Sequence, residues 1–320
     1  MKKDYAIAYM ICRRSIKPMA SMSLKINFIL IFSALFFLMQ SSCSGPAQKD
    51  PEPSIMVSIL PQKYLVERIT GENYRVNVLV PPGASAETYE PTPRQMQDVA
   101  NSAIYFRIGY MEFENTVIRN LQRQNSSLKF VNTAEGVDLI ASEIIDHGDH
   151  VHLSGVDPHI WLSIPAVKIQ LDNIVNAIIE VDPENSRVYQ DNYNIFVEEL
   201  DELHAGFTEK LSDIKRRTFL IFHPALGYFA RDYDLNQVSI EQEGKNPTAA
   251  NMRKIVDIAR EEGIRDVFIQ MEFERDNATA ITRELGGNVV EIDPLSENWM
   301  ENMKLIAEKL HEVLNKNQVP

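Results

Sequence analysis

Apolar runs and amphipathic stretches alternate along the chain after residue 53, and this alternation predicts the fold. In the first half, short runs rich in Ile, Val, Tyr and Phe predict strands, and stretches with apolar residues every three or four positions predict helices. A loop rich in Pro and Gly spans residues 81–93. The predicted strands are 55–60, 74–80, 104–108 and 128–131, and the predicted helices are 62–69, 94–102 and 112–124.

The second half of the chain repeats the scheme. One of its strands is apolar at every position, as expected where helices cover both faces of a parallel sheet. The predicted strands are 219–222, 237–241, 267–270 and 289–292, and the predicted helices are 226–232, 248–262, 276–285 and 299–314. Strands that alternate with helices in this way indicate βα units on a parallel sheet in each half.

A long helical pattern lies between the two halves. It begins at Asp182-Pro183, an N-cap residue followed by proline at the first helical position. Roughly thirty residues at 1.5 Å each would make a rod of about 45 Å, which is too long for one small domain. We interpret it as a rigid connector that spans both lobes. Two helices with a break near residues 204–206 are the alternative.

The N-terminus resembles an export signal. The apolar run 26–39 follows Lys25 and is shorter than the roughly 20 residues that a bilayer-spanning helix needs, but it suits a signal peptide. It ends in small residues around Cys43, an arrangement similar to a lipobox, so we expect Cys43 to carry a lipid anchor. The alternative is an ordinary cleaved signal with a chance cysteine. A polar, proline-rich tether follows.

The fold class that these patterns predict is α/β, with two lobes that each hold a parallel sheet flanked by helices. One long backbone helix joins the lobes as a rigid linker. The expected segments are a signal peptide (1–43), a tether (44–53), an N-terminal α/β lobe (54–181), the connecting helix (182–214) and a C-terminal α/β lobe (215–320).

Charge and cysteine content narrow the partners. The net charge is −13, and removal of the predicted leader would leave about −18. Such an acidic body disfavours nucleic acid and suits cations. Cys12 lies in the leader, so the mature chain has no pair of cysteines for a structural disulfide. We expect a monomer.

Histidine is sparse but clustered. Four of the seven histidines fall within thirteen residues, at His147, His150, His152 and His159. Imidazole is the commonest protein ligand for zinc-like metals. In an α/β protein of two lobes, ligands bind at the loops that follow strands.

Four residues occupy such positions. Glu87 and His223 follow predicted strands, Asp293 follows the last strand, and His159 follows the histidine-rich loop. Each alone is more often a turn former or helix cap than a ligand, but their joint placement favours a metal site.

At these residues the chain resembles a known family. Its motifs are similar to those of the metal-binding lipoproteins of zinc and manganese ABC importers, the ZnuA/TroA-like solute-binding proteins. The resemblance covers essentially the whole mature chain and rests on the runs Glu87-Thr-Tyr-Glu-Pro-Thr-Pro93, Asp157-Pro-His-Ile-Trp-Leu162, His223-Pro-Ala-Leu-Gly-Tyr-Phe229 and Ile292-Asp-Pro-Leu295.

The resemblance implies a non-enzymatic, extracytoplasmic binding protein that captures Zn²⁺ between two lobes. It would be a periplasmic, membrane-anchored lipoprotein whose partners are an ABC permease and its ATPase. The family's ligand positions fall on Glu87 and His159 in the first lobe and on His223 and Asp293 in the second. A surface adhesin, a role of some relatives, is a further alternative, although no separate adhesive segment is evident.

Glu87 is a departure from the family, which normally has histidine there. Glu, two His and Asp can close a tetrahedron around Zn²⁺. The same set also resembles the manganese-binding branch, because harder oxygen ligands suit Mn²⁺. Water in place of Glu87 is another possibility. The substitution therefore leaves the metal open between Zn²⁺ and Mn²⁺ or Fe²⁺.

The histidine-rich loop favours zinc. Family members that handle zinc often carry a His- and Asp-rich loop between the first two ligand positions. His147, His150 and His152 are thus expected to form an auxiliary weak site that feeds the cleft. The alternative is a solvated loop with fortuitous histidines.

Some further residues are expected to support the metal ligands, and two histidines are expected to lie away from the site. Tyr89, Trp161 and Tyr228 are expected to pack around the ligands and hold them in place, and Glu241, Glu243, Gln270 and Glu272 are candidates for contacts behind them. His204 and His311 are expected to be surface or packing residues. A metal-dependent hydrolase is disfavoured, because the chain has no His-Glu-x-x-His helix and no nucleophile elbow.

Overall fold

The computed structural model describes residues 53–121, 128–141, 144–146, 151–153, 155–241, 247–273 and 275–316. The predicted leader with Cys43, the tether as far as residue 52, His147, His150 and Glu243 lie outside these residues. Strand β6 (Val151–Leu153) includes His152, but its side chain is not described. The chain divides into two compact units, residues 1–51 and 52–320, and the fold below is that of the second.

The N-terminal half of this unit holds a parallel sheet of four strands in the order β2-β1-β3-β4. The register aligns Ile55 with Val76 and with Ile104, so the apolar residues of neighbouring strands lie side by side in the core. The elements are β1 (Ser54–Val57), α2 (Leu60–Thr70), a 3-10 turn (Gly71–Asn73), β2 (Arg75–Val78), α3 (Pro93–Ala100), β3 (Ile104–Arg107), α4 (Glu112–Leu121) and β4 (Lys129–Asn132).

The C-terminal half repeats the arrangement with a parallel sheet in the order β10-β9-β7-β8. All four residues of β7 and of β9 are buried, which agrees with the apolar runs in the sequence. The elements are β7 (Thr218–Ile221), α7 (Gly227–Asp232), β8 (Asn236–Ser239), α8 (Ala249–Glu261), β9 (Val267–Gln270), α9 (Arg275–Leu285), β10 (Val289–Ile292) and α10 (Trp299–Asn315). The predicted α/β class with two parallel sheets is confirmed.

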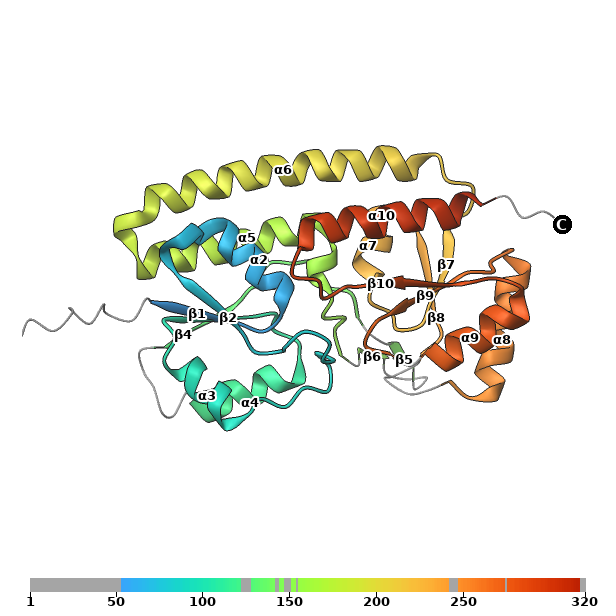
Figure 1. Cartoon of the computed structure of the whole chain (residues 1–320), viewed down its shortest axis with the longest axis horizontal. Coiled ribbons are helices and arrows are strands. Elements are labelled where there is room, and N and C mark those ends of the chain that lie inside the picture. The colour runs from blue at the N-terminus through green and yellow to red at the C-terminus, as the bar shows by residue number, and fades with distance from the viewer. Residues whose placement is uncertain are drawn as a thin grey trace, which may run out of the picture. The chain divides into compact units, whose positions relative to one another are not determined.

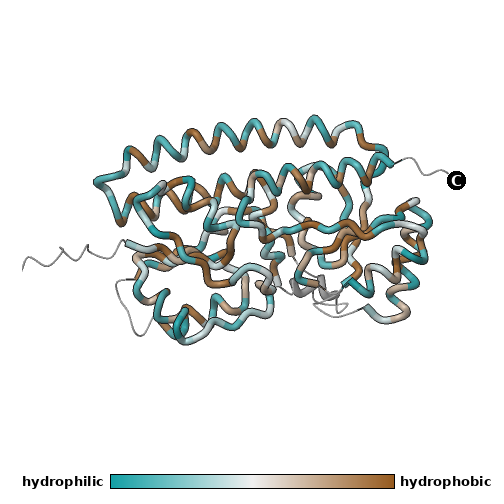
Figure 2. The backbone as a smooth tube through the Cα atoms, viewed as in Figure 1, coloured by the Kyte–Doolittle hydropathy of each residue, from teal (hydrophilic) through white to brown (hydrophobic). Residues whose placement is uncertain are grey.

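The long helix α6 (Ser186–Ser212) runs along both halves and contacts α2, α5 and α10 (Figure 1). It is one continuous helix of 27 residues, so the alternative of two helices with a break is wrong. A 3-10 turn (Pro183–Asn185) precedes it at the predicted start. Its buried side chains recur at helical spacing, and most of its exposed positions are polar, so apolar and polar residues alternate along the helix (Figure 2). The buried side chains are Tyr189, Phe196, Leu200, Phe207 and Leu211.

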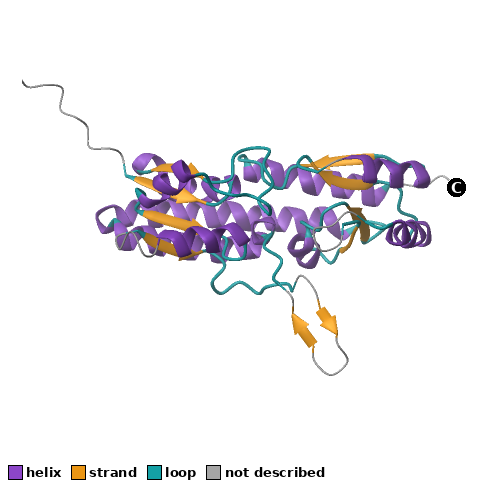
Figure 3. Ribbon diagram, turned by 90° about the horizontal axis from the view of Figure 1, so that it is seen from below, coloured by secondary structure: helices purple, strands orange, loops and turns teal. Residues whose placement is uncertain are grey.

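One helix and one hairpin of two strands were not predicted. Helix α5 (Ile164–Val181) has 18 residues and is so rich in apolar positions that its periodicity is blurred. The sequence does mark the start of this helix. Ser163 is its N-cap and accepts a hydrogen bond from the Ala166 N–H, and Pro165 lies in the first turn. Strands β5 (Ile144–Asp146) and β6 form an antiparallel hairpin inside the histidine-rich loop, and it projects from the two sheets (Figure 3).

One apolar core extends across both halves. It includes the residues between the first sheet, α5 and α6, and continues through Trp161 and Trp299 to α7 and α10. A second, smaller core fills the space between the C-terminal sheet, α8 and α9. In the described part of the chain, no helix is long and apolar enough to cross a membrane.

Gly206 tests the continuity of α6. It is exposed in the last third of the helix, and a Cβ atom there would meet nothing within 4 Å. Gly206→Ala should therefore raise the free energy of unfolding by about 0.5–1 kcal/mol, because glycine is a poor helix former. Urea unfolding of the two proteins measures this, and Ala205→Gly, at the neighbouring exposed position, should lower the stability by a similar amount. A lower stability of Gly206→Ala would contradict a helix that is continuous at this point.

Candidate metal centre

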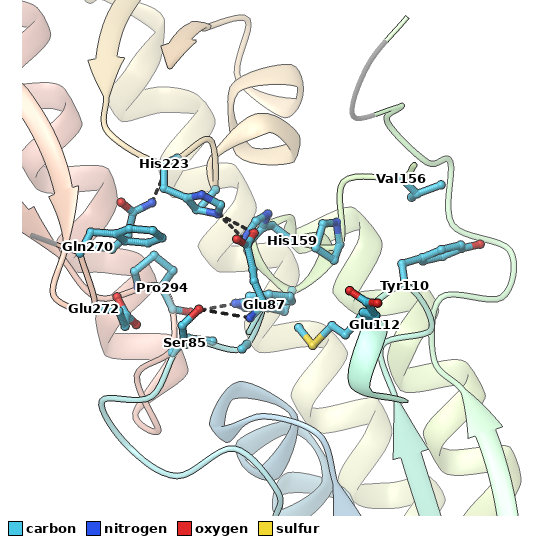
Figure 4. Close-up of a pocket in the computed structure, with 17 residues that line it drawn as sticks. Ser85, Glu87, Tyr110, Glu112, Val156, His159, His223, Gln270, Glu272 and Pro294 are labelled. Atoms are coloured by element: carbon cyan, nitrogen blue, oxygen red, sulfur yellow. Dashed lines mark hydrogen bonds and ion pairs between the residues drawn. The ribbon is translucent and has the colours of Figure 1, made fainter. Parts of the chain in front are cut away.

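Three side chains from distant parts of the sequence converge between the two sheets. The Nε2 atom of His223 lies 3.0 Å from Oε1 of Glu87 and 3.3 Å from Nε2 of His159. One potential ligand atom of each residue lies within 4.8 Å of the others. Figure 4 shows the Glu87 carboxylate pointing at the His223 ring. Among the described residues, this is the cluster that could hold a metal ion.

The fold brings these residues together at the ends of strands. His223 follows β7 directly, and Glu87 lies in the Pro/Gly loop after β2. His159 precedes a 3-10 turn (Ile160–Leu162) that leads into α5. Both histidines are only 7% exposed, whereas the Glu87 side chain is 38% exposed. The site thus has two buried imidazoles and one more accessible carboxylate.

A carboxylate backs each imidazole. Nδ1 of His159 lies 2.7 Å from Oδ1 of Asp157, and Nδ1 of His223 lies 2.8 Å from Oε2 of Glu241. An Nδ1–H group that donates to a carboxylate leaves Nε2 free as the metal-facing atom, and it also fixes the orientation of the ring. Both Nε2 atoms therefore face the same point beside Glu87.

Two further residues fix His223 from the side. The Phe273 ring stacks on its imidazole, with ring centroids 4.8 Å apart and an interplanar angle of 17°. The buried Gln270 side chain donates from Nε2 to the His223 carbonyl at 2.7 Å. The structure thus places Glu241 and Gln270, two of the candidates for supporting contacts, against His223. Asp157 and Phe273 were not predicted to have a role, although Asp157 lies in the motif Asp157-Pro-His-Ile-Trp-Leu162.

The pKa of His223 reflects this environment. Burial alone would lower it, but the hydrogen bonds to Glu241 and Glu87 outweigh burial and raise the pKa to about 9. Burial would raise the pKa of Glu87, yet the bond to His223 holds it below its usual range. In the metal-free protein at neutral pH, a protonated imidazole therefore lies between two carboxylates.

A cavity of about 280 Å³ opens beside the three residues. Tyr110 and Glu112 form part of its wall on the N-terminal side, and Gln270 and Glu272 form part of it on the C-terminal side (Figure 4). Met111 and Phe273 also line it. The loop that carries Tyr110 is fixed by Glu114, whose buried carboxylate accepts bonds from the backbone N–H groups of Ile108 and Gly109, both at 2.7 Å.

Asp293 lies outside the group of three. It lines an adjoining cavity of about 200 Å³, and its Oδ1 accepts a bond from the Leu295 N–H at 3.1 Å. Glu272 lines both cavities, and among the described residues its buried Oε2 atom has no hydrogen-bond partner. Burial raises the pKa of both carboxyls, and in Glu272 the nearby charge of Asp293 adds to this effect. Ligation by Asp293 stays a prediction.

The remaining histidines with described side chains lie elsewhere. His204, on α6, bonds through Nδ1 to the Tyr233 hydroxyl at 2.8 Å, and Nε2 of His311, on α10, lies 2.9 Å from the Asn315 side-chain amide. Both have packing or surface positions, as expected. The auxiliary site of His147, His150 and His152 stays a prediction, because these side chains lie outside the described part of the chain.

Comparisons with known proteins agree with this geometry. A putative metal-binding protein of Chlamydia trachomatis is 27% identical over 285 residues, which cover 89% of this chain and 98% of that protein. The high-affinity zinc uptake system protein ZnuA of Bacillus subtilis is 25% identical over 280 residues, which cover 83% of this chain and 88% of that protein.

Two solved structures match at higher identity. A crystal structure of ZnuA is 35% identical and superposes with a TM-score of 0.76, covering 82% of this chain and 100% of that one. A deletion mutant of ZnuA with zinc bound has the same identity and a TM-score of 0.77, covering 84% and 100%. The family model described as "Zinc-uptake complex component A periplasmic" matches residues 55–313. The chain belongs to this family and is the metal-binding component of an ABC uptake system.

Proposed function

We propose that the protein captures Zn²⁺ outside the cytoplasmic membrane and delivers it to an ABC permease powered by its ATPase. The observation that carries this proposal is the convergence of two carboxylate-backed imidazoles on Glu87. Nitrogen from His and oxygen from a carboxylate are both ordinary Zn²⁺ ligands. The 35% identity to a zinc-bound ZnuA supports zinc further.

Three protein ligands leave one position of a tetrahedron for a further donor. We propose Asp293 for it, and Glu272 is the rival, because its side chain lines the same cavity as the three residues and holds an unpaired buried oxygen. A carboxylate there would balance the charge of the ion, since Glu87 supplies only one negative charge. Mn²⁺ or Fe²⁺ is the alternative cargo, because carboxylate oxygens suit these harder ions.

The rest of the chain fits delivery at a membrane. Lipidation of Cys43 would hold the protein at the surface where the permease lies, with residues 44–53 as the tether. The histidines of the loop, His147, His150 and His152, would raise the local metal concentration beside the cleft. Both parts of the proposal rest on the sequence.

Competition between metals tests the cargo. The mature chain that begins at Ser44, stripped with a chelator, should retain one Zn²⁺ in the presence of excess Mn²⁺, as measured by native mass spectrometry. His159→Ala should lose this ion, because it removes one of the two buried nitrogen ligands. Gln124→Ala, outside the ligand set, serves as the control. Retention of Mn²⁺ in preference to Zn²⁺ would assign the protein to the alternative cargo.

Single substitutions separate the candidates for the fourth ligand. Asp293→Asn should weaken Zn²⁺ binding if Asp293 ligates, and Glu272→Gln should then bind like the parent, in a competition assay with a chromophoric chelator. The reverse result would transfer the role to Glu272.

Proton competition predicts the pH dependence of metal affinity. Below about pH 9 the metal-free site holds a proton on His223, which the ion must displace. Affinity for Zn²⁺ should therefore increase as the pH rises from 6 toward 9 and then level off, in a titration against a chelator of known pH dependence. Glu241→Gln removes one carboxylate that holds the proton, so its profile should level off at lower pH. A flat profile of the parent protein would exclude His223 as a ligand.

A further inference from the structure

We infer that the C-terminal lobe positions His159, although this residue precedes a helix of the N-terminal lobe. Gly227, Tyr228 and Trp299 fix the position of the segment 156–163. His159 and His223 are therefore held in position relative to each other before metal binds. Glu87 is then the ligand that closes on this pair from the other lobe. The inference rests on the proposed metal site and names its positioning residues.

The Tyr228 hydroxyl makes the first connection. Tyr228 lies on α7 and is fully buried. Its hydroxyl donates to the Asp157 carbonyl at 2.8 Å and accepts from the Ile140 N–H at 3.1 Å. Both chain segments that lead to His159 are therefore bonded to the same oxygen of the C-terminal lobe. The pairing of Ala141 with Val156 joins the two segments to each other.

Two indole groups make the second connection. Nε1 of Trp161 donates to the Pro294 carbonyl at 2.8 Å, and Nε1 of Trp299 donates to the Trp161 carbonyl at 2.7 Å. Both indoles are 1% exposed. Trp161 is two residues from His159, and Pro294 follows β10 of the C-terminal sheet. The two bonds run in opposite directions across the lobe boundary, so neither lobe can slide there without breaking one.

Gly227 makes the third connection through its lack of a side chain. A Cβ atom there would lie 2.7 Å from Oδ2 of Asp157. The other oxygen of this carboxylate, Oδ1, accepts from the His159 N–H at 2.9 Å and lies 2.7 Å from its Nδ1. The start of α7 therefore packs directly against the group that orients the His159 ring, and only glycine leaves room for it.

The hydrogen bonds of the segment show the same preference. In the described part of the chain, the side-chain hydrogen bonds that join 156–163 to the C-terminal lobe involve Tyr228, Asp232, His223, Pro294 and Trp299, whereas its link back to the N-terminal lobe is the bond from the Asp157 N–H to the Ile140 carbonyl at 2.9 Å. The short bond from Ser163 to Asp232 ties the cap of α5 to the end of α7. His159 and His223 thus share one support.

Glu87, unlike His159, is supported by the N-terminal lobe. Its loop is held within the N-terminal lobe, where Gln95 donates to the Leu79 carbonyl at 2.7 Å and bonds to the Tyr89 hydroxyl. The Glu87 carboxylate makes an ion pair with His223 of the C-terminal lobe. Metal bound by the two histidines would therefore be enclosed last by Glu87.

The test compares variants that disturb the support of His159 without removing a ligand. Gly227→Ala pushes on Asp157, and Tyr228→Phe removes one hydroxyl while it keeps the ring. Gly206→Ala, on α6 with open space around it, is the matched glycine control. The mature chain is loaded with Co²⁺, whose visible absorption reports ligand geometry, and Zn²⁺ affinity is measured by chelator competition.

We expect Gly227→Ala to bind Zn²⁺ about ten- to a hundred-fold more weakly, the usual effect of losing the group behind a ligand, with an altered Co²⁺ spectrum. Tyr228→Phe should also weaken Zn²⁺ binding and alter the Co²⁺ spectrum. Gly206→Ala should leave both the affinity and the spectrum unchanged. Glu87→Gln should release metal faster in stopped-flow measurements while its association rate stays that of the parent.

Parental affinity and spectrum in both Gly227→Ala and Tyr228→Phe would overturn the inference. Weaker binding with an unchanged spectrum would also overturn it, because the variants would then act through fold stability alone. His223→Ala separates this failure from that of the proposed function. If His223→Ala keeps full affinity, the metal site itself is wrong, and the inference falls with it.

Discussion

The approach of two imidazole Nε2 atoms to 3.3 Å is the interaction on which the rest of this structure depends. Two ring nitrogens with lone pairs do not stay this close in an apolar surrounding unless a cation or a proton lies with them. Here neither ring can turn away, because Asp157 holds one and Glu241 holds the other from behind. Without metal, the proton on His223 allows this approach, and a rigid frame keeps both rings in place. The parallel strands, the long helix and the shared core supply that frame.

The frame joins the lobes more firmly than two separate domains would be joined. One core passes from the first sheet through Trp161 and Trp299 to α10, and α6 lies along both halves. Hinge motion needs a few residues that can absorb large changes in backbone angle, and a continuous helix offers none along its length. Closure around the ion is therefore left to small local movements. Glu87 is the candidate for them, because its carboxylate is exposed whereas both imidazoles are buried.

The sequence was sufficient for the fold class, because strands that are buried on both faces and helices with one apolar face leave different patterns. β9 and β10 were predicted to the residue. Helix α5 was not predicted because apolar residues lie on most of its circumference. The spacing of three or four residues that marks an amphipathic helix is therefore not visible in its sequence. For the site, the motifs and the strand ends indicated Glu87, His159 and His223, which the structure brings together. The role of Gly227 could not be predicted, since it depends on a contact 70 residues away in the chain.

Glu87 stands where the resemblance to the family implies histidine, and a glutamate there changes the charge of the site. With Glu87 and Glu241 on either side, His223 lies between two carboxylates, and its raised pKa is the direct consequence. A histidine at position 87 would add a neutral ligand and no negative charge, so the proton on His223 would be held less tightly. The substitution therefore strengthens the attraction for any cation, and the proton is one of them. A divalent ion gains about twice the Coulomb attraction of a proton at the same distance, so it can still displace the proton when its geometry is met. The two fixed nitrogens thus set the geometry that the ion must meet, while the carboxylate adds negative charge and an oxygen ligand that suits harder ions such as Mn²⁺.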